Sequence, residues 1–191
     1  MGYNPKIHHR RSIRIQGFDY SKAGCYFITL VCQHRKNFFG KIILDANRQN
    51  KVKLSPTGEI AQSCWLEIPI HYPNVKLHEF VIIPDHMHGI LEIKQQADLE
   101  SNNQRIPQVN KYQKIIPKSI GSILRGYKIG VTKWFRDQCM KEDWILIDRQ
   151  EIVLWQRNYY EHIIRNQFEY FVFSNYIRNN PKNWKGKIEE I

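Results

Sequence analysis

Two histidines separated by one residue, His86 and His88, are the side chains of this sequence best suited to hold a metal ion. If they lie on a β-strand, positions i and i+2 point to the same face, about 7 Å apart along the backbone, while Met87 points into the core. Two such imidazoles can bind a divalent metal whose other ligands come from another element and from substrate oxygens. The pattern also arises by chance in roughly one such chain in four. A strand with two surface histidines is therefore the alternative.

The elements that must position this pair follow from turn signals and hydrophobic periodicity. Ser55-Pro56 is typical of a helix start, because Ser is a good N-cap and Pro fits the first helical position. Pro84-Asp85 predicts a turn directly before the histidine strand. We expect a helix after Pro117 and another from residue 166 to about residue 178. The predicted strands and extended segments are residues 25–33, 38–44, 75–78, 79–83 and 86–93, with a strand, turn and strand over residues 144–154.

This order of elements predicts an α+β fold, an antiparallel sheet with helices packed on one face. The 191 residues are enough for one domain with a real core, and we expect a single domain over residues 1–191. Within it, residues 1–23 resemble a basic N-terminal arm. Residues 95–117 are polar and carry two prolines, which predicts a mobile loop.

The charge of the chain favours a polyanionic partner. Lys and Arg total 29 against 18 Asp and Glu, a net charge of +11. The excess lies at the two ends of the sequence, and residues 54–110 are acidic on balance. Such a surface attracts nucleic acid through counterion release, although a solvated basic face without a partner is the alternative. No apolar run is long enough for a membrane span. The four cysteines form no CxxC pair, so we expect reduced thiols in a cytoplasmic, nucleoid-associated protein.

Four ordered segments resemble a known family, and the first is Arg11-Ser12-Ile13-Arg14 followed by Tyr20 and Tyr26-Phe27-Ile28-Thr29, which resembles the opening of that family. Residues 80–91 (FVIIPDHMHGIL) resemble the HUH signature of single-strand DNA endonucleases, and more closely that of the REP-associated tyrosine transposases. Residues 155–166 (WQRNYYEHIIRN) and 175–181 (NYIRNNP) resemble the downstream block and the nucleophile helix of that family. The resemblance covers most of the chain and implies a ferredoxin-like, RRM-type palm. It also implies a site for Mg²⁺ or Mn²⁺, single-stranded or hairpin DNA of repetitive palindromic elements as substrate, and a 5′-phosphotyrosine intermediate.

The nucleophile position of that family falls on Tyr176. Helix geometry agrees, because Tyr176 and Asn180 are four residues apart and lie on one helical face. The resemblance implies that Asn180 supplies a third metal ligand, but Pro181 follows it and disfavours helical geometry at Asn180. A core tyrosine is the alternative for Tyr176, and Tyr159 and Tyr160 are the rival tyrosines. We predict that the final helix crosses the sheet and brings Tyr176 to the two imidazoles.

Further residues are candidates for DNA contact. Basic side chains can grip phosphates, and aromatic side chains can stack on bases. Asp85 and Glu161 are candidates for orienting the histidines, although we expect a surface position for Asp85. An ion pair with Glu161 is the alternative role for Arg165. The predicted DNA-binding residues are Arg10, Arg11, Arg14, Lys128, Arg157, Tyr159, His162 and Arg165.

The sequence thus predicts a metal-dependent single-strand DNA endonuclease and strand transferase of the transposase type. Two alternatives stay open at this point. One is a non-catalytic module that binds single-stranded nucleic acid, and the other is a metal-dependent nuclease that uses water. We expect a monomer in which Tyr176 acts on the metal site of its own chain, and a dimer that exchanges the final helix is the alternative.

Overall fold

The structure is a computed structural model that describes residues 18–94, 117–141 and 153–189. Its centre is a four-stranded sheet with the strand order β4-β5-β1-β6, in which all neighbouring strands are antiparallel. These strands are β1 (Gly24–Val31), β4 (Val75–Ile83), β5 (His86–Ile93) and β6 (Tyr160–Ile164). The helices are α1 (Pro56–Leu66), α2 (Ile68–His71), α3 (Ile120–Lys141) and α4 (Gln167–Asn179), with a 3₁₀ turn at Gln33–Arg35.

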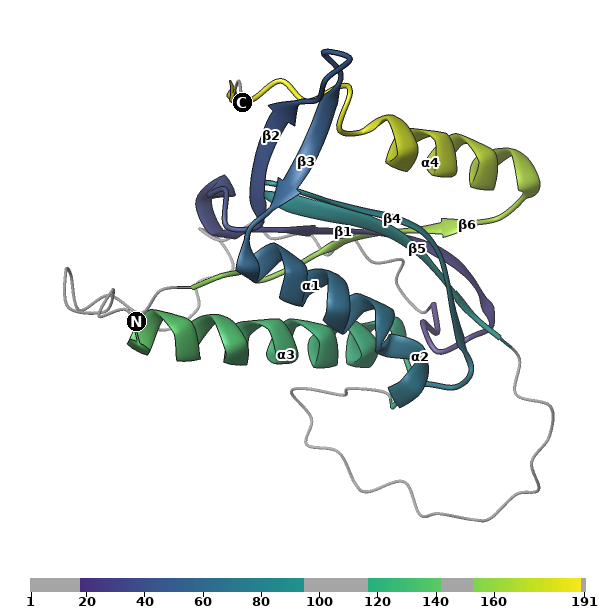
Figure 1. Ribbon diagram of the computed structural model, residues 1–191. Coiled ribbons are helices and arrows are strands. Elements are labelled where there is room, and N and C mark those ends of the chain that lie inside the picture. Colours follow the sequence, from purple (N-terminus) through teal and green to yellow (C-terminus); the bar gives the residue numbers. More distant parts are fainter. Residues whose placement is uncertain (1–17, 95–116, 142–152, 190–191) are drawn as a thin grey trace, which may run out of the picture.

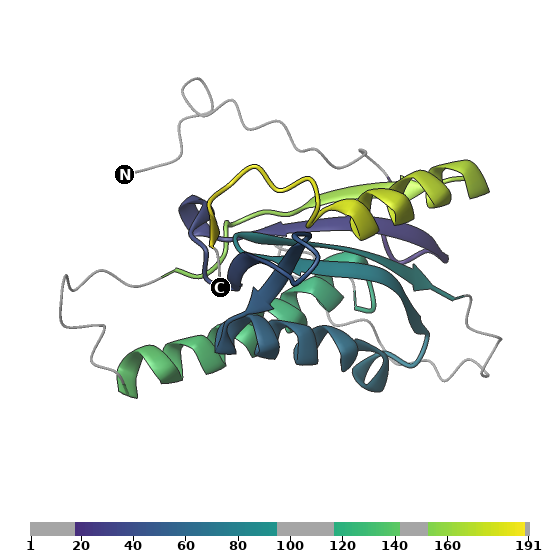
Figure 2. The same cartoon turned by 45° about the horizontal axis from the view of Figure 1, so that its top comes forward.

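The connectivity is that of a ferredoxin-like βαββαβ unit. Strand β1 leads through α1 to β4, which lies parallel to β1 with β5 between them, and β5 leads through α3 to β6. Helices α1 and α3 pack side by side on one face of the sheet, and α4 lies across the opposite face (Figures 1 and 2). The predicted α+β fold with an antiparallel sheet and helices packed on one face is confirmed, and α4 is an addition on the other face.

Two features of the sequence set the element boundaries that matter for the site. Ser55 caps α1, since its hydroxyl oxygen accepts a hydrogen bond from the Gly58 backbone amide at 3.1 Å. Asn166 caps α4 in the same way, with its side-chain oxygen 2.8 Å from the Glu169 amide nitrogen. Between β4 and β5 the chain turns within Pro84 and Asp85, because Ile83 pairs directly with His86. The first histidine therefore stands at the very start of β5.

Alternation along the strands divides the core between the two faces. The larger cluster lies between the sheet and helices α1 and α3, and it includes the fully buried Tyr26, Trp65 and Met87. The smaller cluster lies under α4 and is built on Phe27, Ile90 and Ile177. Since β5 alternates strictly, Met87 belongs to the first face, and its neighbours in sequence, His86 and His88, belong to the α4 face.

The strands at Asn50–Leu54, Tyr160–Ile164 and Ile188–Glu189 were not predicted from the sequence, whereas the strand at Gly40–Leu44 lies within the predicted strand at residues 38–44. A small second sheet has the order β3-β2-β7 and contains β2 (Gly40–Leu44), β3 (Asn50–Leu54) and β7 (Ile188–Glu189). The fourth strand of the main sheet is β6, although the sequence analysis placed a strand pair over residues 144–154. Most of that segment lies outside the described residues, as do nearly all of the predicted loop at 95–117 and residues 1–17 of the predicted arm. Within the described ranges, no helix combines the length and hydropathy of a membrane span.

Candidate active site

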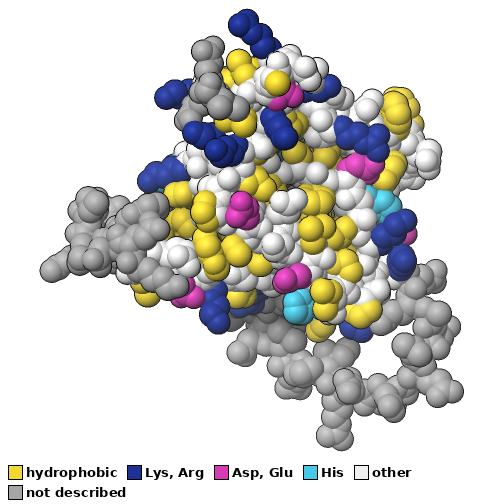
Figure 3. Space-filling model, viewed as in Figure 1, with side chains coloured by type: hydrophobic (Ala, Val, Ile, Leu, Met, Phe, Trp, Pro, Cys, Tyr) yellow, Lys and Arg dark blue, Asp and Glu magenta, His cyan; other side chains and the backbone are white. Residues whose placement is uncertain are grey.

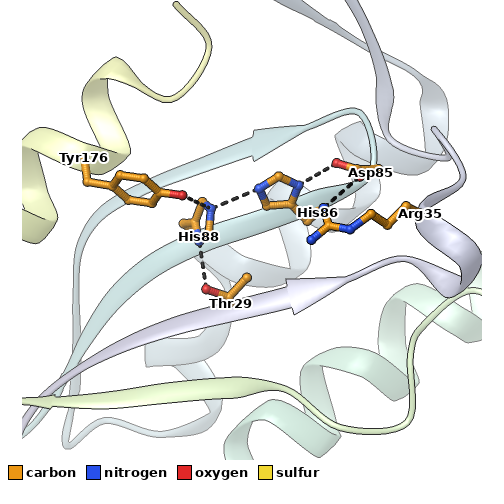
Figure 4. A network of polar contacts seen from close by, with 6 residues as sticks. All are labelled: Thr29, Arg35, Asp85, His86, His88 and Tyr176. Carbon is orange, nitrogen blue, oxygen red and sulfur yellow. Dashed lines mark hydrogen bonds and ion pairs between the residues drawn. The ribbon is translucent and has the colours of Figure 1, made fainter. Parts of the chain in front are cut away.

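The two histidines face each other on the α4 side of the sheet. Their Nε2 atoms are 3.0 Å apart, and the ring planes are nearly perpendicular (Figure 4). His88 is 4% exposed and pairs in register with Thr29 of β1, while His86 is half-buried at the end of the strand pair. Period-two alternation therefore places both side chains together, as the sequence predicted.

The other nitrogen of each imidazole is held by a neighbouring oxygen. His86 Nδ1 lies 2.5 Å from Asp85 Oδ1, and His88 Nδ1 lies 2.8 Å from Thr29 Oγ1. In the tautomers that carry the proton on Nδ1, both Nε2 atoms present a lone pair to the space between the rings. An oxygen partner behind each imidazole is the usual arrangement for metal-ligating histidines.

Asp85 has a different position from the one expected. It is only 5% exposed, so the predicted surface position is wrong. Its carboxylate accepts hydrogen bonds from His86 and, at 3.1 Å, from Arg35 (Figure 4). Burial raises the pKa of Asp85, but hydrogen bonds and charges of His86 and Arg35 outweigh burial, and the net shift is downward. Asp85 is therefore an anionic support for His86.

His88 remains neutral at physiological pH. Burial, and next the neighbouring charge of His86, lower its pKa to about 3. A neutral imidazole keeps a free lone pair, which is the form that binds metals or accepts a hydrogen bond.

Tyr176 of α4 reaches this pair from the opposite element. Its hydroxyl oxygen lies 3.3 Å from His88 Nε2, and the two rings meet edge to face (Figure 4). Tyr176 is 47% exposed, so the alternative of a core tyrosine is wrong. The hydroxyl of this partly exposed side chain lies beside a neutral imidazole. Asn180 is the C-cap of α4 and 8% exposed. Among the contacts of the described residues, none joins its side chain to either histidine, and its role as a ligand stays a prediction.

Helix α4 is held over the site by Glu79. The carboxylate of Glu79 accepts hydrogen bonds from Tyr170 at 3.0 Å and Ser174 at 3.2 Å, and it also pairs with Arg178. These three residues lie four apart, on one face of α4. Burial raises the pKa of Glu79, but its hydrogen bonds and the Arg178 charge prevail and lower it. Glu79 was not among the residues predicted from the sequence, because its partners on α4 lie 91, 95 and 99 residues further along the chain.

Three of the predicted DNA-binding residues line one groove. Lys128, Arg157 and Tyr159 lie along a hollow of about 610 Å³ beside α3. Lys128 donates hydrogen bonds to the carbonyls of Gln156 and Asn158, and burial lowers its pKa to about 8. Lys128 therefore also holds the segment that carries Arg157. The other basic residues of this groove are Arg125, Lys133 and Arg136.

Of the remaining predicted DNA-binding residues, His162 and Arg165 contact side chains of α4. His162 lies 3.3 Å from Glu169 and packs against Phe173, and Arg165 pairs with Glu169 in place of Glu161. The reason is that residues 160–164 form a strand and not a helix, so a residue four positions away does not lie on the same helical face. Arg10, Arg11 and Arg14 lie outside the described residues.

No protein-family model matches this chain. An uncharacterized protein of Haemophilus influenzae is 41% identical over 184 residues, which are 96% of this chain and 94% of that protein. The two proteins belong to one family. At this level of identity over nearly the full length of both chains, the two proteins share a fold.

Solved structures place the family among known folds. A REP-associated tyrosine transposase bound to a REP hairpin superposes with a TM-score of 0.54 at 18% identity, over 88% of this chain and 73% of that one. The family therefore has the fold of this transposase. A candidate transposase of Deinococcus radiodurans covers 88% of this chain and 97% of its own length, at 13% identity and a TM-score of 0.41. That value is too low to support a common fold.

Proposed function

We propose that this protein is a metal-dependent single-strand DNA endonuclease and strand transferase that uses Tyr176 as its nucleophile. The observation that carries the proposal is the 3.3 Å distance between the Tyr176 hydroxyl and His88 Nε2, across 88 residues of sequence. A hydroxyl nucleophile beside the neutral His88 and a second imidazole oriented by Asp85 is an arrangement suited to phosphodiester transfer. The transposase fold of the solved neighbour supports the same conclusion.

The residues present fit a small divalent metal. Adjacent ligands of an octahedral Mg²⁺ or Mn²⁺ are about 3 Å apart at metal–ligand distances of about 2.1 Å, and the two Nε2 atoms are 3.0 Å apart. His86 and His88 would hold the ion, with Asn180 as the proposed third protein ligand. When bound, the metal supplies Lewis acidity that withdraws charge from a non-bridging phosphate oxygen.

The chain's own residues account for the rest of the transfer. Tyr176 Oη forms a bond to phosphorus, and the bond from phosphorus to the 3′ oxygen breaks. The products are a 5′-phosphotyrosine and a free 3′-hydroxyl, and the proton lost by the phenol balances the proton that the 3′ oxygen gains. Because the number of phosphodiester bonds is conserved, a second 3′-hydroxyl can reverse the step and transfer the strand without ATP.

The proposed substrate is single-stranded DNA with a hairpin. The solved neighbour is bound to a REP hairpin, and this chain offers both kinds of surface that such DNA needs. The groove beside α3 carries basic side chains for phosphates, and Tyr160, at 48% exposed, lies near Tyr176 on the α4 face and can stack on a base. Such a role would associate the protein with the nucleoid.

A covalent adduct assay tests the proposal. The full-length protein is incubated with end-labelled single-stranded hairpin DNA and Mn²⁺ or Mg²⁺, and the products are separated on a denaturing gel. We expect a protein–DNA band that disappears in Tyr176→Phe, in His86→Ala and after removal of the metal with EDTA. Tyr72→Phe is the control, because Tyr72 is half-buried on the α3 side of the sheet, where its hydroxyl donates to the Ser122 carbonyl.

The outcomes separate the three candidate functions. Cleavage without an adduct, retained in Tyr176→Phe, would show a nuclease that uses water. Binding to a panel of hairpins without cleavage or adduct would favour a non-catalytic module. Mixing Tyr176→Phe with His86→Ala tests the proposed monomer, since two inactive chains restore activity only if they exchange the final helix.

A further inference from the structure

A β-bulge in β4 turns two consecutive side chains toward α4. Leu77 pairs with Leu91 and Phe80 pairs with Gly89, so β4 has two residues where β5 has one. The extra residue breaks the strict alternation, and both His78 and Glu79 reach residues on the α4 side of the sheet. Glu79 anchors α4, as described above. His78 has a different set of neighbours.

Three side chains of different chemistry converge beside the bulge. Cys25 of β1 and Glu92 of β5 are direct cross-strand partners, and His78 reaches them from β4. One ligand atom from each residue, a thiol sulfur, an imidazole nitrogen and a carboxylate oxygen, lies within 4.8 Å of the other two. All three residues are half-buried. They belong to three separate strands, so no spacing in the sequence predicts the cluster.

The hydrogen bonds of His78 leave one nitrogen for a cation. Tyr170 donates its single hydroxyl proton to the Glu79 carboxylate at 3.0 Å, so its oxygen accepts from His78 Nδ1, also at 3.0 Å. In the neutral tautomer that carries its proton on Nδ1, His78 Nε2 presents a lone pair. That lone pair faces a carboxylate oxygen of Glu92 at 2.9 Å. Two electron-pair donors at this distance need a positive charge between them.

We propose that Cys25, His78 and Glu92 form a second metal site, selective for Zn²⁺ or a similar transition-metal ion. Sulfur, imidazole and carboxylate ligands together suit zinc, and a tetrahedral site leaves a fourth position for water. Ligand atoms around zinc are about 3.3–3.7 Å apart, so small side-chain rotations complete the geometry. The site is separate from the His86–His88 pair, since Cys25 precedes Thr29 by four residues, about 13 Å along β1.

The second site would support the fold around the first. A metal there joins β1, β4 and β5, and the His78–Tyr170 hydrogen bond connects it to α4. An oxygen partner behind a histidine ligand is the arrangement expected when the metal must be held in a fixed orientation. The assignment does not rest on the function proposed above, because it uses none of the residues of that site.

Cobalt spectroscopy tests the assignment. Metal-free full-length protein is titrated with Co²⁺, and a thiolate-to-cobalt charge-transfer band is followed in the near ultraviolet. We expect the band to saturate by about two equivalents, because the His86–His88 pair can bind cobalt without a thiolate band, and to disappear when Zn²⁺ is added. It should be lost in Cys25→Ser, and His78→Gln should weaken cobalt affinity by about 10-fold or more. Cys64→Ser, a half-buried thiol outside the cluster, and His86→Ala should leave the band unchanged.

A second measurement keeps the proposal falsifiable if a variant does not fold. In the wild-type protein, Zn²⁺ should slow alkylation of Cys25 by iodoacetamide at least several-fold, while Cys64 is unaffected, as read by mass spectrometry. Absence of a thiolate band, an unchanged band in Cys25→Ser, or equal alkylation of Cys25 with and without zinc would overturn the assignment. The His78–Glu92 contact would then be an ion pair of an imidazolium and a carboxylate.

Discussion

At the scale of single residues, the orientation of the two histidines depends on the side-chain oxygens that contact their Nδ1 atoms. Asp85 and Thr29 each engage an Nδ1 atom and thereby direct both Nε2 atoms to one point. Asp85 is adjacent to His86 in sequence, so its role was open to sequence reasoning. Thr29 lies 59 residues from His88 in sequence, and only the register between β1 and β5 brings it there.

The hydrogen bond between Thr29 and His88 can be removed by a substitution that keeps the shape of the Thr29 side chain. In Thr29→Val the hydroxyl is replaced by a methyl group, and His88 loses the partner that fixes its ring and tautomer. We expect the affinity for Mn²⁺ at the His86–His88 site to fall about 10-fold, as is usual for partners behind metal ligands. Isothermal titration with Mn²⁺ measures this, with Thr132→Val on α3 as control. Equal affinities would show that Thr29 has no part in the site.

At the scale of elements, the docking of α4 determines whether Tyr176 meets the histidines. The apolar cluster under α4 is small, with Phe27, Ile90 and Ile177 as its buried members. Glu79 adds hydrogen bonds to Tyr170, Ser174 and Arg178 along one side of the helix. Because few apolar side chains are buried under α4, hydrophobic burial alone holds the helix on the sheet only weakly. The hydrogen bonds and the ion pair of Glu79 add to the stability of its docking.

Replacing Glu79 tests this dependence. Glu79→Gln keeps the size of the side chain but removes the charge that Arg178 and the two hydroxyls share. We expect a loss of about 1–3 kcal/mol in the free energy of unfolding and faster amide hydrogen exchange in α4 than in α1 and α3. Adduct formation through Tyr176 should slow as well. Glu59→Gln, an exposed carboxylate on α1, is the control, and unchanged exchange in α4 would contradict the anchoring role.

Gly89, directly after His88, lies on the opposite face of β5, where Trp65 leaves no room for a side chain. A Cβ atom at this position would lie 2.5 Å from the Trp65 ring of α1. Gly89→Ala should therefore force Trp65 or β5 to move and destabilise the protein by about 1–3 kcal/mol. Urea unfolding measures the change. In Gly126→Ala on α3 the added methyl meets nothing closer than 3.5 Å, and that variant should be more stable by roughly 0.5–1 kcal/mol.

At the scale of the whole molecule, positive charge is spread over several surfaces. On the face shown in Figure 3, Lys and Arg side chains gather mainly over the upper part, near the β2–β3 hairpin. Exposed basic residues of this region are Arg48, Lys51, Lys53, Lys182 and Lys185. The groove beside α3 is a second basic surface. A polyanion as long as a DNA hairpin can contact more than one of them.

Salt dependence measures how many phosphates the groove contacts. If Arg125 and Arg157 each neutralise one phosphate, replacing either with Ala should weaken hairpin binding and reduce the slope of log K against log [salt] by about 0.7–0.9. Fluorescence anisotropy at several salt concentrations gives the slope. Lys94→Ala removes an exposed charge that does not line the groove and should leave the slope unchanged. Unchanged slopes in both arginine variants would exclude the groove from DNA binding.

Much of the fold and part of the site follow from the sequence, because they depend on local rules. Period-two alternation places His86 and His88 on one face of the sheet, and the caps at Ser55 and Asn166 start α1 and α4. Tyr176 and Asn180 are four residues apart, so helical geometry places them on one face of α4. Each of these relations involves neighbours in the chain, so backbone geometry alone fixes it.

Only the tertiary structure decided which of these local features meet. The strand register brings Thr29 to His88, the bulge in β4 brings Glu79 to α4 and His78 to Cys25, and packing buries Asp85 where sequence reasoning placed it on the surface. Such contacts join residues that are tens of positions apart, and their geometry depends on how whole strands and helices pack. The sequence determined the His-Met-His pair and the tyrosine helix separately, and docking of α4 across the sheet brought Tyr176 within 3.3 Å of His88.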